Sequence, residues 1–321
     1  MTPTLYLTRN CLLEPLGQSQ VFAYLRGLSR DHAITLITYE KPEDRADSAR
    51  MARAQEACAA HGIRWLPQTF RPRPRIIAPA LSMVWMACLL WREVRNGRAK
   101  LIHARSYIPA AVVVTVHRLT GVAFIFAMRA LWAEELITAK RLNRGSILHS
   151  AIKSVERACL RDAAAVVSLT HAAVAHLKRE CSEELDGQRI GVIPTCADLD
   201  CFAPARTKRT VPPVHGCIGT ILSGWFRADW LEAWISTVAI DDLDACFDIV
   251  SYDDADRVCA ALNPKGALGD RLSISPRSSE EMPDAVRGHD LSVMFYAGGE
   301  VSELGRSPNR MTEIFGLRVT S

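Results

Sequence analysis

Short apolar runs of strand type alternate with amphipathic helical segments along almost the whole chain, and this alternation limits the fold more than any other feature. The first residues show it: a strand-like run at 4–9 precedes a helical pattern at 17–28, and a second strand-like run follows at 33–39. Repeated strand–helix–strand units join through right-handed crossovers into parallel sheets. We therefore expect an α/β protein built on parallel sheets.

A change of composition divides this series into two halves. The first half contains further strand-like runs at 100–103, 122–127, 165–169 and 190–193, and the second half contains runs at 216–219, 247–250, 272–274 and 291–295. Between them, residues 203–213 are polar, basic and proline-bearing, as is typical of a linker. The sequence predicts a first domain at residues 1–205, a linker at 206–214 and a second domain at 215–321.

The composition excludes several classes of function. The net charge of +4 comes without a long basic block, which argues against a nucleic-acid-binding protein. The 10 cysteines include no Cys-x-x-Cys pair, and no histidine stands at ligand spacing beside the close pair Cys196 and Cys201, which argues against a zinc site. We also expect no cofactor. Scattered cysteines and the lack of a secretory signal favour a cytoplasmic protein.

One apolar stretch, residues 76–91, bears on membrane contact. It is shorter than the roughly 20 residues that a membrane-spanning helix needs. Basic residues flank it: Arg71, Arg73, Arg75, Arg92 and Arg95. We expect a buried helix of the first domain. The alternative is a helix lying on the inner face of a membrane, with its basic flanks toward anionic lipid, as a peripheral contact.

Polar residues follow several predicted strands of the first domain, where open α/β sheets bind their ligands. The loop after the first strand reads Leu-Gly-Gln-Ser-Gln-Val at 16–21, which makes residues 17–20 candidates, although glycine and serine also simply cap helices. His103, Arg105 and Arg129 follow two later strands. The ordinary pKa range of histidine suits proton transfer, whereas the alternative for His103 is a partly buried ring bonded to the backbone.

The second domain carries two candidate anion-binding segments. Gly219 and Gly224 lie in a loop after a predicted strand, where glycines let backbone amides approach a diphosphate; the alternative is an ordinary turn. Ser307 is expected to cap a helix that offers its free amides to an anion. Arg310 and Glu313 share a face of that helix, suiting a phosphate and a ribose hydroxyl, or else forming a simple surface ion pair.

As a set, these segments resemble family 4 glycosyltransferases. The matching strings are residues 16–21, 102–109 (Ile-His-Ala-Arg-Ser-Tyr-Ile-Pro), 124–135, 192–204 and 307–313, where Arg310 replaces the lysine of a Ser-Pro-x-Lys-x-x-Glu motif. The resemblance implies a GT-B fold of two facing Rossmann-like domains. It also implies retaining transfer of a sugar from a nucleotide-sugar donor to a glycan or lipid-linked acceptor, in surface polysaccharide biosynthesis, without a metal.

The motifs and the resemblance together assign roles to named residues. The predicted catalytic residues are His103 and Arg129. The predicted donor-binding residues are Gly219, Gly224, Arg227, Ser307, Arg310 and Glu313. The predicted acceptor-side residues are Gly17, Gln18, Ser19, Gln20, Arg105 and Tyr107.

Several departures from the family pattern leave other functions open. Ala127 stands where the family has aspartate, Ala130 where it has glycine, and Gly305 where a Glu-x₇-Glu pair would begin. The chain also ends at Ser321 within an expected strand, so we expect an incomplete second domain. The alternative is a degenerate, non-catalytic GT-B protein that acts as a binding or scaffolding partner. A dinucleotide-dependent enzyme is a weaker alternative, because no Gly-x-Gly-x-x-Gly follows the first strand.

Overall fold

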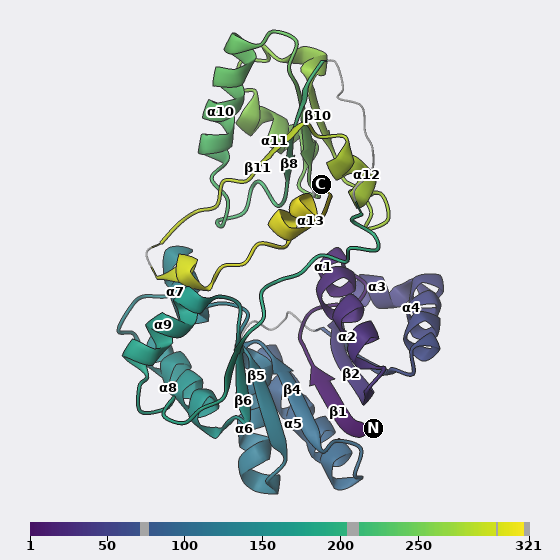
Figure 1. The fold of residues 1–321 in the computed structure, drawn as a ribbon, viewed down its shortest axis with the longest axis vertical. Coiled ribbons are helices and arrows are strands. Elements are labelled where there is room, and N and C mark those ends of the chain that lie inside the picture. Colours follow the sequence, from purple (N-terminus) through teal and green to yellow (C-terminus); the bar gives the residue numbers. More distant parts are fainter. Residues whose placement is uncertain (71–76, 204–211, 300, 318–321) are drawn as a thin grey trace. The chain divides into compact units, whose positions relative to one another are not determined.

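The computed structural model describes residues 1–70, 77–203, 212–299 and 301–317 (Figure 1). The described residues form two compact units: unit 1 comprises residues 1–195 and 301–307, and unit 2 comprises 196–299 and 308–317. The predicted linker at 206–214 lies largely outside the described residues. Unit 1 ends at residue 195, ten residues earlier than the predicted first domain, and it also includes the later segment 301–307.

Hydrogen bonds explain why residues 301–307 belong to unit 1. The Thr195 backbone N–H donates to Ser307 Oγ over 3.1 Å, and the Thr138 hydroxyl donates to Ser302 Oγ over 3.0 Å. The Thr170 hydroxyl donates to the Leu304 carbonyl. These contacts join residues more than 100 positions apart, so a linear reading of the sequence does not reveal the return segment.

Unit 1 is built on a seven-stranded parallel sheet with the order β3-β2-β1-β4-β5-β6-β7 (Figure 1). Its strands are β1 Thr2–Leu7, β2 His32–Glu40, β3 Arg64–Thr69, β4 Leu101–Arg105, β5 Ala123–Ala127, β6 Ala165–Ser168 and β7 Ile190–Val192. The chain builds outward from β1 through β2 to β3, then returns to place β4 on the other side of β1. The reversal between β1 and β4 is the topological switch point where such sheets bind ligands.

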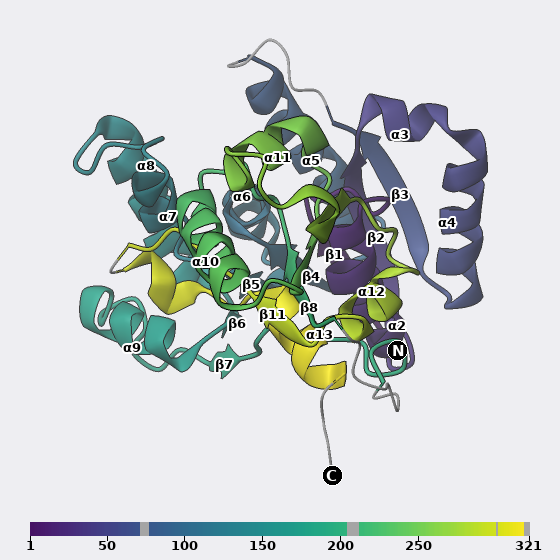
Figure 2. The same cartoon turned by 90° about the horizontal axis from the view of Figure 1, so that it is seen from above.

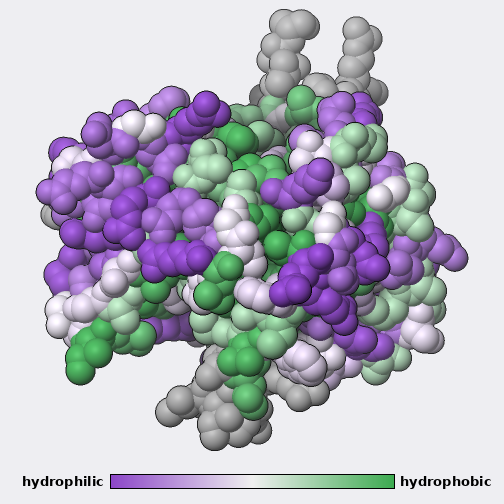
Figure 3. All heavy atoms as spheres, turned by 90° about the horizontal axis from the view of Figure 1, so that it is seen from below, coloured by the Kyte–Doolittle hydropathy of each residue, from purple (hydrophilic) through white to green (hydrophobic). Residues whose placement is uncertain are grey.

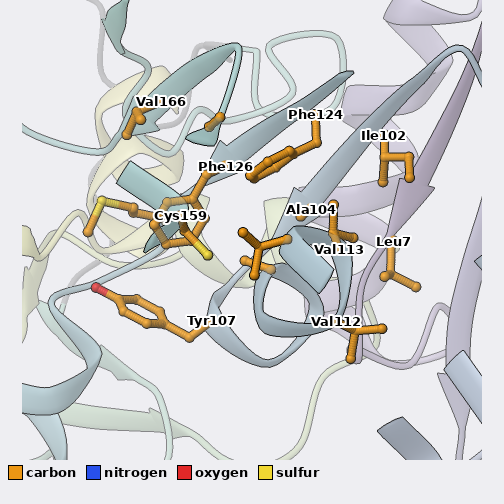
Figure 4. Close-up of a cluster of buried hydrophobic side chains, with 14 of the residues drawn as sticks. Leu7, Ile102, Ala104, Tyr107, Val112, Val113, Phe124, Phe126, Cys159 and Val166 are labelled. Atoms are coloured by element: carbon orange, nitrogen blue, oxygen red, sulfur yellow. The ribbon is translucent and has the colours of Figure 1, made fainter. Parts of the chain in front are cut away.

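Helices cover both faces of this sheet. They are α1 Pro15–Gly17, the π-helix η1 Gln18–Phe22, α2 Ala23–Leu28, α3 Pro42–Ala46, α4 Ser48–Ala60, α5 Ile77–Arg95, α6 Tyr107–Thr120, α7 Trp132–Thr138, α8 Ile147–Asp162, α9 His171–Glu180 and the 3₁₀ helix η3 Ser302–Gly305. Helices α3 and α4 lie beside the β2–β3 edge (Figure 2). Alternate strand residues face opposite sides, so Leu7 enters the larger core under α5, α6 and α8 (Figure 4), whereas Tyr6 enters the core under α2 and α4.

Unit 2 has a four-stranded parallel sheet with the order β10-β9-β8-β11. Its elements are β8 Val214–Ile218, α10 Ala228–Asp241, β9 Cys246–Val250, α11 Ala255–Leu262, the 3₁₀ helix η2 Gly269–Arg271, β10 Leu272–Ser275, α12 Met282–Arg287, β11 Leu291–Val293 and α13 Asn309–Leu317. Phe247 and Ile249 face one apolar core, and Ile218 and Val250 face the other. No helix within the described residues is long and apolar enough to cross a membrane.

The predicted fold class is confirmed, with two corrections to its elements. Apart from the final one, each predicted strand within the described residues corresponds to a strand of the structure. Strand β3 was not predicted, because Arg64, Pro67 and Gln68 interrupt its apolar pattern. Proline is tolerated there because β3 is an edge strand. Gly316 and Leu317 were expected in a final strand, but they form the end of α13, where Leu317 packs into a core of unit 2.

The loop between β1 and α1 depends on a close backbone contact at Gly17. A Cβ atom added to Gly17 would lie 2.0 Å from the Cys11 carbonyl oxygen, so no larger residue fits. Gln18 Nε2 closes the same loop by donating to the Leu12 carbonyl over 2.7 Å. The glycine predicted on the acceptor side therefore has a packing role: it lets the first helical turn lie against the loop.

We expect Gly17→Ala to destabilise unit 1 by ~1–3 kcal/mol, the usual cost of overpacking. Gly27→Ala is the matched control in the same helical segment, because nothing lies within 4 Å of its added Cβ. That control should stabilise the protein by about 0.5–1 kcal/mol through helix propensity. Urea unfolding measures both changes, and the same sign for the two variants would contradict the packing argument.

Candidate functional site

Three rings from two strands and a helix meet at the switch point of unit 1. Tyr6 on β1 pairs with His103 on β4, and their ring centroids lie 4.6 Å apart. Tyr24 of α2 lies 5.9 Å from the His103 ring, measured between centroids. Directly paired strand residues point to the same side of a sheet, so this cluster follows from the β1–β4 register.

Two arginines share one amide oxygen beside these rings. Arg105 Nη2, at the end of β4, donates to Gln20 Oε1 over 2.6 Å, and Arg129 Nη2, after β5, donates to the same oxygen over 2.9 Å. Arg129 Nη2 also donates to Thr195 Oγ1 over 3.2 Å, and Arg105 Nη1 to the Tyr6 hydroxyl over 3.4 Å. Gln20 belongs to the π-helix η1, and such irregular turns are frequent at functional sites.

The structure thus brings together four of the predicted site residues of unit 1: Gln20, His103, Arg105 and Arg129. Gln18 and Gly17 instead shape the loop that precedes them, and Ser19 lies in η1 between Gln18 and Gln20. Sequence spacing could not show this arrangement, because Gln20 and Arg129 are 109 positions apart.

Burial changes the chemistry expected of His103. Its removal from water, with the nearby charges of Arg105 and Arg129, lowers the pKa of His103 to about 3. The imidazole is therefore neutral near pH 7. This pKa lies well below the ordinary histidine range on which the prediction of proton transfer depends, and a neutral ring offers one N–H donor and one acceptor nitrogen. The catalytic role of His103 stays a prediction.

Tyr107, predicted on the acceptor side, lies in the core of unit 1 instead. Its ring packs against that of Phe126 (Figure 4), with the two centroids 5.4 Å apart. Its hydroxyl donates to Glu156 Oε2 over 2.6 Å. Burial and the Glu156 carboxylate raise the pKa of Tyr107 well above its ordinary value. Tyr107 is therefore no part of the cluster around Gln20.

In unit 2, Arg310 and Glu313 lie on one face of α13, as their spacing predicts, and they form the ion pair that is the alternative to donor binding. Arg310 Nη1 donates to Glu313 Oε2, and Asn309 Nδ2 donates to Glu313 Oε1 over 2.8 Å. The Glu313 side chain is buried, and burial raises its pKa against the lowering effect of Arg310. Helix α13 begins at Asn309, one residue later than predicted. Ser307 belongs to unit 1, where its hydroxyl accepts the Thr195 N–H over 3.1 Å.

The other predicted donor residues lie around the end of β8. Gly219 directly follows this strand, and an added Cβ on Gly224 would meet nothing within 4 Å, so no close contact requires Gly224 to be glycine. Arg227 is not isolated: its guanidinium pairs with Asp229 and stacks 4.3 Å from the Trp230 ring centroid. Among the described residues, no group of three or more His, Cys, Asp or Glu could hold a metal ion.

Packing accounts for one of the departures from the family pattern. A Cβ atom on Gly305 would lie 2.9 Å from the Leu131 backbone nitrogen, so a larger side chain needs η3 to shift. Ala127 is buried at the end of β5, where its carbonyl accepts the Ser106 N–H over 2.9 Å. Nothing in the structure explains Ala130.

The low pKa of His103 predicts a loss of stability in acid. Below the ordinary pKa of about 6.5, the unfolded chain binds a proton at His103 that the folded chain does not. The free energy of unfolding should therefore fall as the pH drops from about 6.5 toward 3, by up to ~1.4 kcal/mol per pH unit.

Urea unfolding at several pH values measures this slope. His103→Gln should flatten it, whereas His171→Gln, at an exposed position that begins α9, should leave it unchanged. Equal slopes in the parent and His103→Gln would show that His103 is not held neutral.

Comparison with known proteins extends these observations. The model of Glycosyltransferase Family 4 matches residues 18–201. No curated protein matches the sequence. Sucrose-phosphate synthase from Thermosynechococcus elongatus has a TM-score of 0.64 at 15% identity, over 95% of this chain and 79% of that one. A glycosyltransferase from Rickettsia africae has a TM-score of 0.61 at 13% identity, over 91% and 72%.

A third similar structure contains ligands. HepE from Anabaena, in complex with UDP and glucose, has a TM-score of 0.59 at 13% identity, over 94% of this chain and 76% of that one. At such identities the structures show the fold alone, which is that of GT-B glycosyltransferases, with parallel sheets in both units. The family model covers more than half of the sequence, and the chain belongs to glycosyltransferase family 4.

Proposed function

We propose that the protein moves a sugar from a nucleotide-sugar donor to a glycan or lipid-linked acceptor, with retention of configuration, in polysaccharide assembly. The observation that carries this proposal is the cluster of Gln20, His103, Arg105 and Arg129 at the switch point of a family 4 chain. Structures of the similar protein HepE hold UDP or UDP-glucose, which supports a nucleotide sugar as donor.

In this proposal unit 2 binds the nucleotide. Arg310 has a charge suited to the diphosphate, and Glu313 retains acceptor capacity for ribose hydroxyls, because a carboxylate can accept about four hydrogen bonds. A guanidinium fixed beside the departing diphosphate stabilises its developing charge. The ion pair between Arg310 and Glu313 keeps both side chains in place before the donor binds.

Unit 1 receives the acceptor in this proposal. His103 is neutral, so it orients a sugar hydroxyl by hydrogen bonding, and Arg129 supplies a positive charge near the reacting sugar. The rings of Tyr6 and Tyr24 both contact the His103 ring, with centroids 4.6 and 5.9 Å from its own. The proposed transfer therefore uses electrostatic stabilisation rather than proton transfer by histidine.

A second candidate is binding of the same ligands without turnover. The observation that favours it is Gly305, whose contact with Leu131 leaves no room for the carboxylate side chain that the family pattern places there. Ala127 likewise removes a carboxylate from the end of β5. A transfer assay separates the two functions: a labelled sugar that reaches an acceptor with its anomeric configuration retained supports the enzyme, and binding alone supports the second candidate.

For the donor site, we expect Glu313→Ala to weaken binding of a nucleoside diphosphate by ~1–3 kcal/mol, because Arg310 and Asn309 lose their shared partner. Calorimetric titration with uridine and guanosine diphosphates measures the change. Glu280→Ala is the control, since Glu280 is an exposed carboxylate of the same unit. Unchanged affinity in Glu313→Ala, in a folded protein, would refute the assignment.

We also propose that α5 contacts an anionic membrane surface, which suits a lipid-linked acceptor. The prediction of a buried helix holds for one face only: Met86 and Leu90 are fully buried, whereas Leu81, Val84 and Trp85 are 61%, 61% and 71% exposed. These three residues share a helix face through their i, i+3 and i+4 spacing. Hydrophobic side chains lie at the surface among hydrophilic ones in the view from below (Figure 3).

The charge near this face favours lipid over another protein as its partner. Arg92 and Arg95 lie in the last turn of α5, and the Arg95 guanidinium stacks 5.9 Å from the Trp91 ring centroid. Exposed apolar residues followed by arginine and tryptophan match the interfacial pattern of helices that lie on membranes. The predicted basic flank at Arg71, Arg73 and Arg75 lies outside the described residues.

Vesicle co-sedimentation tests this contact. We expect the protein to bind phosphatidylglycerol vesicles, not phosphatidylcholine vesicles, and to dissociate as salt rises, because salt screens the arginines. Leu81→Ser combined with Trp85→Ser should reduce binding at least about tenfold, since it removes two exposed apolar side chains. Trp230→Ser, at a 52% exposed residue of unit 2, is the control. Equal binding by both variants would refute the proposal.

A further inference from the structure

The guanidinium of Arg105 is buried, and no carboxylate of the described residues pairs with it. The residue is 5% exposed, and none of the ion pairs among the described residues includes it. Its partners are the neutral Gln20 amide oxygen and, at the longer distance of 3.4 Å, the Tyr6 hydroxyl. A buried charge that is not neutralised is costly, so this arrangement favours a ligand that brings a negative charge.

One nitrogen of Arg105 also has an unused donor. Arg105 Nε is buried and has no hydrogen-bond partner among the described residues. A guanidinium offers five N–H donors in a fixed plane, and it binds phosphate and carboxylate through two of them at once. The Nε–H can therefore donate to an anionic oxygen while Nη2 remains bonded to Gln20.

The surroundings add positive charge to this position. Gln20 Oε1 already accepts from both Arg105 and Arg129, so the two guanidiniums are held near a single neutral oxygen. Their combined charge is strong enough to contribute to the low pKa of His103. An anion bound here would meet two cations and two phenolic rings, Tyr6 and Tyr24.

The backbone next to Arg105 is strained, which is a second and separate sign of function. Ser106 has φ 75° and ψ 174°, a conformation that is rare for residues other than glycine. Its amide donates to the Ala127 carbonyl, which ties the ends of β4 and β5 together. Strain of this kind persists where the surrounding structure holds a particular backbone geometry. Here the geometry that is held is that of the chain directly after Arg105, the last residue of β4.

We propose that Arg105 binds an anionic group, a phosphate or a carboxylate, carried by the acceptor. The inference rests on the proposed function, because it assigns the ligand to the acceptor side of the same reaction. It narrows the acceptor from any glycan to one that carries a negative charge close to the hydroxyl that receives the sugar. The diphosphate of the donor is the other source of the same chemistry, and the experiment separates the two.

Titration of the full chain with inorganic phosphate and, separately, with glucuronate tests the anion site. The readout is the ¹H–¹⁵N signal of Arg105 Nε, assigned by its loss in Arg105→Gln. Saturable movement of this signal supports the proposal, because the unpartnered N–H gains an acceptor. By calorimetry, Arg105→Gln should weaken phosphate binding about tenfold or more, the loss expected for a charged hydrogen bond.

Arg118→Gln is the matched control, because Arg118 is an arginine of unit 1 already paired with Asp162. An Nε signal that neither anion moves, or Arg105→Gln binding both anions as tightly as the parent, overturns the proposal. Circular dichroism and thermal unfolding establish that the variant is folded. If Arg105→Gln misfolds, the signal in the parent still decides the outcome.

Titration with uridine diphosphate in the same samples assigns the source of the anion. If Arg105→Gln loses nucleotide affinity as much as phosphate affinity, the anion belongs to the donor and the acceptor assignment is overturned. Retained nucleotide affinity with lost phosphate affinity supports it. The absence of sugar transfer by a parent that binds both anions would refute the proposed function and leave the anion site intact, so the two failures are distinguishable.

Discussion

The buried carboxylate of Glu40 holds the loop that follows β1 at the switch point of unit 1. It lies fully buried at the end of β2, where it accepts the Leu12 N–H over 2.9 Å and the Leu13 N–H over 3.3 Å. The Cys11 thiol also donates to it, and burial beside this carboxylate raises the pKa of Cys11 to about 12, so the thiol keeps its proton. Three donors from one loop therefore converge on one side chain of the neighbouring strand.

That loop determines where the functional side chains lie. It leads into α1 and the π-helix η1, which carry Gln18 and Gln20. Gly17 allows the helix to lie against the loop backbone, and Gln20 then reaches the arginines at the ends of β4 and β5. Glu40 thus anchors the loop that precedes the helical segment carrying Gln20.

The two proposed binding regions use charge differently. In unit 2, the Arg310 guanidinium is paired with Glu313, so its charge is balanced within one helix. In unit 1, Arg105 rests on neutral partners and retains an unused donor. An ion pair keeps its two side chains in place before a ligand binds. A buried cation without a carboxylate partner is stabilised more by an anionic ligand, because the ligand offsets the free energy lost on desolvating the charge.

The sequence alone determined the fold class, and it predicted where a site would lie. Alternating strand and helix patterns predicted parallel sheets, and residues near the ends of β1, β4 and β5 were predicted to bind ligands. The spacing of Arg310 and Glu313 predicted that the two side chains share a face of one helix, because residues three apart on a helix are neighbours. These predictions succeed because they depend only on the periodicity of residues that are close in sequence.

Only the tertiary structure decided the partners of these residues. It joined Gln20 to Arg105 and Arg129, buried Tyr107 against Glu156, and placed Glu40 under the loop after β1. It also made His103 neutral, since desolvation and the approach of two arginines depend on strand order and register. Periodicity shows which face of an element is apolar, but it does not show which distant element will cover that face.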